Sequence, residues 1–106
     1  MITRMILVSV PKERAAEAER MWKEECAPLM IKQPGCLSEQ FLRGRENPGE
    51  FISVSTWEDQ AAIDRYRASE AHKAVQQHTR ALKISMIKNH SAIVAAPRMP
   101  ATIPSR

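Results

Sequence analysis

The sequence predicts one α+β domain whose elements follow the order β-α-β-β-α-β. Runs rich in β-branched residues, typical of strands, alternate with charged segments in which apolar residues recur every three or four positions, as in helices. Glycine and proline stand at the breaks between these segments. The chain has 106 residues, which is enough for one domain with a hydrophobic core but leaves no room for a second domain.

The first strand is predicted over residues 2–10, where β-branched residues alternate in part with other residues up to Pro11. Pro11 suits the first turn of a helix, because the backbone N–H that proline lacks has no partner there. The helix that follows carries an apolar stripe at spacings of three and four, and Pro28 is expected to end or kink it. The stripe consists of Ala15, Ala18, Trp22, Cys26 and Leu29.

A hairpin is predicted next. Pro34 and Gly35 break the chain before a strand over residues 36–43. The turn at Asn47-Pro48-Gly49 then leads into a strand over residues 51–57. We expect the two strands to pair as a hairpin with a longer loop.

The second helix is predicted to begin after Asp59, whose carboxylate can cap it. Ser69 offers a second cap, so we expect the helix to bend there. A fourth strand is expected between residues 84 and 96. The inward stripe of the helical region consists of Ala62, Ile63, Tyr66, Ala71, Val75, His78 and Leu82.

Together these elements make a ferredoxin-like arrangement, with one antiparallel sheet and two helices on one of its faces. Both parities of the first and third strands carry large apolar groups, so neither face of the sheet suits water. We expect the sheet of an identical chain to cover the open face, which gives a homodimer. The candidates for that face are Leu37, Glu39, Phe41 and Arg43 on one strand, and either Phe51 and Trp57 or Ile52 and Val54 on the next.

Charge and composition exclude several classes of partner. The formal net charge is +4, but no basic run carries interleaved aromatics, so no nucleic acid partner is predicted. No apolar run approaches the roughly 20 residues that span a membrane, so no membrane partner is predicted. Gly35, Gly44 and Gly49 all fall in turns, which leaves no phosphate loop for a nucleotide cofactor.

The cysteines and histidines show no metal-binding pattern. Cys26 and Cys36 lack a metal or redox spacing, and no secretory segment precedes them, so we interpret them as buried free thiols of a cytoplasmic protein. His72 and His78 are separated by about 9 Å of helical rise, too far to share a metal ion. No metal site is predicted.

The hairpin, the strand that ends at Trp57 and the helix that carries Ser69-Glu70-Ala71-His72 together resemble the antibiotic biosynthesis monooxygenase (ABM) domain family. The resemblance implies a domain over residues 1–96 that pairs into a dimeric α+β barrel, with a pocket between each sheet and its own helices. Residues 97–106, which include three prolines, are expected to form a C-terminal tail.

The resemblance also implies a function, that of a cofactor-independent monooxygenase acting on a small aromatic, quinol or polyketide-like substrate. In such chemistry the substrate is deprotonated and its anion gives an electron to O2, so the protein supplies a base and oriented polar groups. His72, at the end of the Ser-x-x-His element, is implied as the base, with Tyr66 or Asn89 orienting the substrate. The residues expected to contact the substrate are Trp57, Phe41, Arg43 and His78.

Each of these side chains also has a structural interpretation. His72 is as readily a surface histidine bonded to a neighbouring carbonyl, and Tyr66 as readily a structural bridge. Core packing or a dimer contact is favoured for Trp57 over a pocket wall, and a hydrogen-bonded core histidine is favoured for His78.

Glu39 and Arg43 have the same parity on the second strand, so they project from one face. If a partner sheet covers that face, the two charges must pair, either structurally or around a ligand.

Two other functions remain as alternatives. A haem-degrading branch of the same fold uses an Asn in the first strand, a Trp in the second helix and a His beyond the Ser-bearing turn. This chain has Ile6, Tyr66 and Gln76 at those places, which makes haem cleavage the weaker enzymatic hypothesis. A non-enzymatic dimer that binds a small ligand or responds to stress is the second alternative, because one fold can host several functions.

Overall fold

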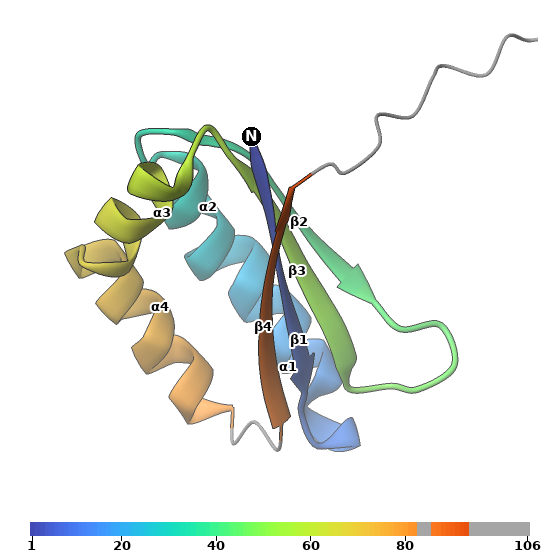
Figure 1. The fold of residues 1–106 in the computed structure, drawn as a ribbon. Coiled ribbons are helices and arrows are strands. Elements are labelled where there is room, and N and C mark those ends of the chain that lie inside the picture. The colour runs from blue at the N-terminus through green and yellow to red at the C-terminus, as the bar shows by residue number, and fades with distance from the viewer. Residues whose placement is uncertain (83–85, 94–106) are drawn as a thin grey trace, which may run out of the picture.

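The computed structural model describes residues 1–82 and 86–93, which form one sheet with helices against one of its faces (Figure 1). The strands are β1 (Ile2–Ser9), β2 (Cys36–Arg43), β3 (Glu50–Trp57) and β4 (Met86–Ile93). They lie in the order β2-β3-β1-β4, and every neighbouring pair is antiparallel. The predicted α+β fold with a single antiparallel sheet is therefore confirmed within the described residues.

The first helical region changes its winding along its length. A 3₁₀ turn (η1, Lys12–Arg14) leads into α1 (Ala15–Met21), a π-helical turn (η2, Trp22–Cys26) follows, and α2 (Ala27–Ile31) completes the region. Pro28 does not end the helix there, because it lies in the first turn of α2. Proline lacks a backbone N–H and its ring crowds the preceding turn, and the wider winding just before it relieves both problems.

The second helical region bends where the sequence predicts. α3 (Gln60–Arg67) begins after Asp59, whose Oδ1 accepts a hydrogen bond from the Ala62 N–H at 2.8 Å. α4 (Glu70–Ala81) begins after Ser69, whose Oγ accepts one from the His72 N–H at 3.2 Å. Both predicted caps are confirmed, and the second fixes the point at which His72 enters its helix.

The alternation of β3 sets which face of the sheet meets the helices. Phe51 and Trp57 are 1% and 0% exposed and belong to the core, whereas Ile52 and Val54 point to the open face. A bulge in β2 between Cys36 and Ser38 shifts the alternation by one residue, so the odd-numbered residues in the rest of that strand face the helices. Of the candidates for the open face, Glu39, Phe41, Arg43, Phe51 and Trp57 therefore face the helices instead.

Stacked rings join the helical layer to the sheet. The Phe41 ring lies between Trp22 and Phe51, with ring centroids 4.9 Å and 4.7 Å away. Trp57 stacks on Tyr66 of α3 at 5.2 Å. Such pairs contribute about 0.5–1.5 kcal/mol each beyond the area that they bury. The helices are thus held at both ends of the sheet.

The two cysteines are free thiols, of which Cys26 is fully buried and Cys36 is partly buried. Burial raises the pKa of Cys26 to about 12, so this thiol is protonated and unreactive at neutral pH. The expectation of a buried free thiol is confirmed for Cys26, whereas Cys36 lies nearer the surface. No helix of the described residues is both long enough and apolar enough to span a membrane. The predicted tail, residues 97–106, lies outside the described residues.

Gly49, in the loop between β2 and β3, gives a steric test of the fold. Its φ is +97°, and a Cβ added there would lie 2.4 Å from the Val10 carbonyl oxygen. We expect Gly49→Ala to lower the free energy of unfolding by about 2 kcal/mol or more, because the left-handed backbone and the close approach both penalise a side chain. Urea denaturation followed by circular dichroism measures the loss.

Gly44→Ala in the same loop is the matched control. The φ of Gly44 lies outside the left-handed region, and an added Cβ would meet its nearest atoms at 3.3 Å. Its loss should be clearly smaller, and equal losses for the two variants would contradict the proposed strain at Gly49.

Candidate functional site

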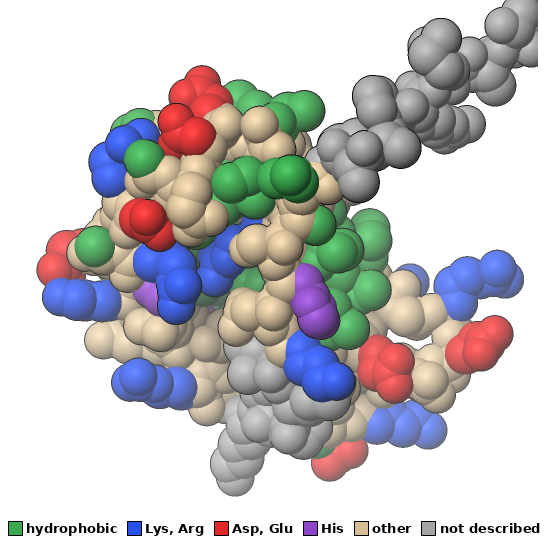
Figure 2. Space-filling model, viewed as in Figure 1, with side chains coloured by type: hydrophobic (Ala, Val, Ile, Leu, Met, Phe, Trp, Pro, Cys, Tyr) green, Lys and Arg blue, Asp and Glu red, His purple; other side chains and the backbone are tan. Residues whose placement is uncertain are grey.

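A cavity lies between the helical layer and the sheet, where α3 and α4 face β1 and β4. Its volume is about 140 Å³. Figure 2 shows Lys and Arg side chains around the hollow between the helices and the strands. The apolar lining consists of Ile6, Val8, Trp22, Met30 and Val75, and the polar lining of Arg4, Tyr66, Arg67, His72, Gln76, Thr79 and Asn89.

Arg4 projects from β1 into this cavity and is only 6% exposed. No described residue forms a hydrogen bond or an ion pair with its guanidinium. Burial lowers the pKa of Arg4, an effect that Tyr66 and Glu39 oppose and Arg67 reinforces. Because arginine stays protonated in proteins, Arg4 is a buried cation with no carboxylate in contact among the described residues.

His72 enters the cavity from the first turn of α4. Its imidazole meets the Tyr66 ring edge-on, with centroids 5.1 Å apart and planes at 78°. Burial lowers the pKa of His72, as do the charges of Arg4 and Arg67, while a hydrogen bond to the Arg67 backbone opposes them. The imidazole is therefore neutral at neutral pH and able to accept a proton. His72 therefore has both the backbone hydrogen bond of the structural interpretation and a place in the cavity, as the functional interpretation expects.

Tyr66 lies between the core and the cavity. It is 2% exposed, stacks on Trp57, and has no hydrogen bond from its hydroxyl to any described residue. Burial raises the pKa of Tyr66, although Arg4 opposes the shift, so the phenol keeps its proton and can donate a hydrogen bond.

Asn89 reaches the same cavity from the edge strand β4. It lies opposite Ile6 in the β1–β4 ladder, and both residues line the cavity. The structure thus brings together His72, Tyr66 and Asn89, the three residues to which the sequence assigned chemistry. Gln76, one turn beyond His72 on α4, joins them.

Trp57 and His78 lie outside this cavity. Trp57 is fully buried, and its Nε1 donates a hydrogen bond to Ser55 Oγ at 2.9 Å. The Nδ1 of His78 lies 3.1 Å from an oxygen of Glu25. These positions suit the structural roles that the sequence favoured for both residues, and their contact with a substrate remains a prediction.

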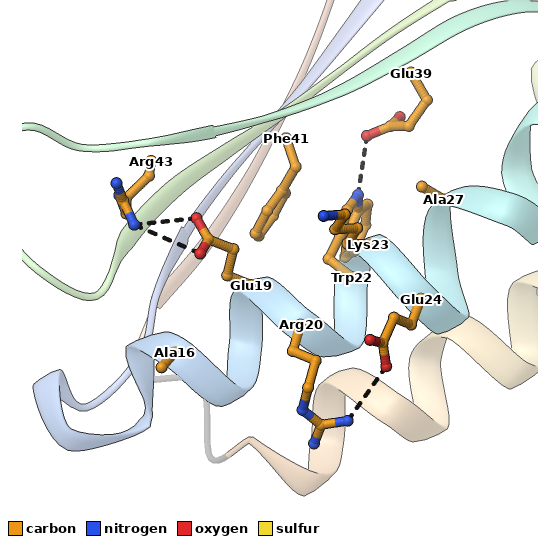
Figure 3. A pocket seen from close by; sticks show the side chains of 10 residues that line it. All are labelled: Ala16, Glu19, Arg20, Trp22, Lys23, Glu24, Ala27, Glu39, Phe41 and Arg43. Carbon is orange, nitrogen blue, oxygen red and sulfur yellow. Dashed lines mark hydrogen bonds and ion pairs between the residues drawn. The ribbon is translucent and has the colours of Figure 1, made fainter.

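Phe41 and Arg43 line a different hollow, an open groove of about 640 Å³ between β2 and the helices α1 and η2 (Figure 3). Arg43 forms an ion pair with Glu19 at 3.3 Å and not with Glu39. Trp22 touches both the groove and the cavity. Of the predicted substrate contacts, Phe41 and Arg43 line the groove, whereas the predicted catalytic residues His72, Tyr66 and Asn89 line the cavity on the other side of this indole.

Glu39 is a partly buried acid that lines the groove. Its Oε1 accepts hydrogen bonds from Trp22 Nε1 at 3.1 Å and Ser53 Oγ at 2.9 Å, as Figure 3 shows for the first. Its buried Oε2 has no partner among the described residues. Burial raises the pKa of Glu39 to about 7, although the two hydrogen bonds and Arg4 oppose the shift. Near neutral pH this carboxyl is therefore present in both protonation states.

Arg4 was not identified from the sequence. A signal was present, since Arg4 interrupts an otherwise apolar inward parity that includes Ile6 and Val8. In residues 1–82 and 86–93, no group of three His, Cys, Asp or Glu side chains is placed to hold a metal ion.

Known proteins share both the sequence pattern and the fold. A family model described as antibiotic biosynthesis monooxygenase matches residues 1–78, from β1 into α4. The chain belongs to the antibiotic biosynthesis monooxygenase (ABM) family. The matched region contains Arg4, Tyr66 and His72, whereas Asn89 lies beyond it. No curated protein matches the sequence.

Solved structures show the same ABM fold at low sequence identity. A candidate antibiotic biosynthesis monooxygenase from Deinococcus radiodurans is 17% identical, with a TM-score of 0.82 over 96% of this chain and 100% of that one. A single-residue mutant of SnoaB, a cofactor-independent oxygenase from Streptomyces nogalater, is 22% identical, with a TM-score of 0.76 over 91% of this chain and 94% of its own. PA3566 from Pseudomonas aeruginosa is also 22% identical, with a TM-score of 0.75 over 90% and 94% of the two chains.

The raised pKa of Glu39 makes the stability of this ABM protein depend on pH. The pKa is about 7 in the folded state against an ordinary value of 4.5, so between these values the folded state binds more protons than the unfolded state. Wild-type stability should therefore fall as pH rises through this window. Glutamine does not titrate and still accepts from Trp22 and Ser53, so Glu39→Gln should gain roughly 2 kcal/mol relative to wild type across the window.

Urea denaturation at a series of pH values measures this difference. Glu46→Gln, which replaces an exposed acid in the β2–β3 loop, is the control and should stay parallel to wild type. A difference between Glu39→Gln and wild type that does not change with pH would show that the carboxyl titrates normally.

Proposed function

We propose that this chain is a cofactor-independent monooxygenase that oxidises a small phenol or quinol with O2. One observation carries the proposal: His72, Tyr66 and Asn89 line a single cavity, and its environment keeps His72 neutral. A neutral imidazole beside hydrogen-bond donors is what the deprotonation of a phenol requires. Membership of the ABM family supports the proposal, and SnoaB, which shares the fold, is a cofactor-independent oxygenase.

In this mechanism His72 accepts the proton of a bound phenol, and the Tyr66 hydroxyl donates a hydrogen bond to the phenolate oxygen. The phenolate gives one electron to O2, and the resulting superoxide and phenoxyl radical combine at a ring carbon. The peroxide takes back the proton from His72 and then loses water, with the ring hydrogen of the attacked carbon, to leave a quinone. One oxygen atom enters the ring and the other leaves as water, so the four electrons lost by the substrate reduce one O2. Asn89 orients the ring toward His72.

Replacement of the base should remove most of the activity. We expect purified protein to consume O2 with phenols, quinols or dihydroxynaphthalenes without added metal, flavin or haem, and His72→Ala to be slower by about 100-fold or more. Since only neutral His72 accepts a proton, the rate should rise with pH through a pKa below the ordinary 6.5 and then level off. An oxygen electrode measures both effects.

Gln77→Ala, on an exposed position of the same helix, is the control and should retain full activity. If His72→Ala retains wild-type activity, His72 is not the base. If no substrate supports uptake, the function as a non-enzymatic binding protein is favoured instead. Stoichiometric haem binding with a sharp Soret band would favour haem cleavage.

We also propose that the protein is a homodimer that pairs through the open face of the sheet. Met5 lies opposite Val54, and Leu7 opposite Ile52, in the β1–β3 ladder on that face. Leu42 of β2 is 46% exposed. Figure 2 shows hydrophobic side chains grouped on the side of the strands away from the helices. An exposed apolar area of this kind on a sheet marks a surface that another protein chain covers.

A charge at the centre of that face should separate the subunits. We expect light scattering to show a dimer for wild type and a monomer for Val54→Asp, because pairing would bury the new carboxylate without a partner. Gln77→Asp, which adds the same charge to α4, should remain a dimer. A monodisperse wild-type monomer at micromolar concentration would refute the proposal.

A further inference from the structure

We infer that Arg4 anchors an anionic ligand in the cavity between α4 and β1, and that this ligand is a single aromatic ring bearing a negatively charged oxygen. The inference rests on the proposed function, because it names the substrate class of the same cavity. It goes further in giving a role to a residue that the mechanism above does not use.

The charge of the cavity is the first argument. Arg4 is 6% exposed, and no described residue pairs with its guanidinium. A buried cation without a partner is costly, so a site that keeps one gains when an anion binds. The described residues that line the cavity include a second cation, Arg67, and no Asp or Glu. Glu39, the acid whose charge acts on Arg4, lines the groove instead, and its hydrogen bonds are to Trp22 and Ser53 and not to Arg4.

The hydrogen-bonding groups are the second argument. Burial keeps the proton on Tyr66, and the described residues leave its hydroxyl without a hydrogen bond. Asn89 and Gln76 bring amide donors to the same cavity. A planar guanidinium with neutral donors around it matches a phenolate or carboxylate oxygen, because charge-assisted hydrogen bonds are the strongest of their kind.

The size of the cavity limits the rest of the ligand. Its volume of about 140 Å³ is close to that of a cavity of about 150 Å³ known to accept one benzene molecule. Apolar side chains of Ile6, Val8, Met30 and Val75 supply walls for such a ring. A fused tricyclic aromatic would leave most of its rings outside. The cavity therefore favours monocyclic phenols over the polyketide-like substrates considered from the sequence.

The test uses 4-nitrophenol, because its phenolate absorbs visible light whereas its neutral form does not. Wild-type protein should bind it as the phenolate and lower its apparent pKa. Arg4→Met keeps the length of the side chain without its charge, and it should abolish that shift and weaken binding by about tenfold to hundredfold. Arg4→Lys should restore part of both effects. Arg65→Met removes a cation from an exposed position on α3 and should behave as wild type.

A second measurement on the wild-type protein needs no variant to fold. Benzoate should displace nitrophenolate, whereas neutral benzamide, of nearly the same shape, and anthracene-9-carboxylate, with three rings, should each compete at least about tenfold less well. Equal competition by benzoate and benzamide, binding of neutral nitrophenol, or an unchanged shift in folded Arg4→Met would each overturn the inference. Oxygen uptake without nitrophenolate binding leaves the proposed function standing and removes this inference. Nitrophenolate binding without oxygen uptake on any substrate leaves this inference standing and removes the proposed function.

Discussion

A positive charge kept away from water acts, after burial itself, on the titratable groups around it on the cavity side of the sheet. Arg4 lies on β1, which has a strand on each side, and its side chain lines the cavity and is only 6% exposed. Its charge adds to burial in keeping His72 neutral, and it opposes burial in the cases of Tyr66 and Glu39. Because Arg4 faces inward from β1, the direction in which the side chains of this one strand point affects the protonation states available in the cavity.

The features that the sequence predicted correctly depend on local signals. Asp59 and Ser69 cap helices because a short side chain reaches the N–H three residues ahead, whatever the rest of the chain does. The hairpin turn at residues 47–49 likewise depends on a few adjacent residues whose types favour a turn. Of the two effects predicted for Pro28, ending the helix was wrong, because the π turn that precedes it accommodates the ring and has no comparable local signal in the sequence.

The directions of the strands were harder to predict because both parities of β1 and β3 are apolar, so alternation did not decide which side meets the helices. Parity alone also says nothing about strand order. Phe41 and Asn89 both face the helices, but β2 and β4 are opposite edges of the sheet, separated by three strand spacings or about 14 Å. A ligand of one ring does not span that distance. This is why residues that the family resemblance assigned to one substrate site are found in two hollows.

The π turn at Trp22–Cys26 makes the first helical region sensitive to its exact length. Each residue of an α-helix advances the chain by about 100° around its axis. Removing one residue from this turn would rotate Trp22 by that angle relative to Met30, so the indole and the methionine would no longer face the core together. A chimera that joined the α1 of a relative with a plain α-helix to the α2 of this chain would therefore lose the indole that separates the cavity from the groove. Among relatives, single-residue insertions and deletions in this turn should mark lineages in which the two hollows are connected differently.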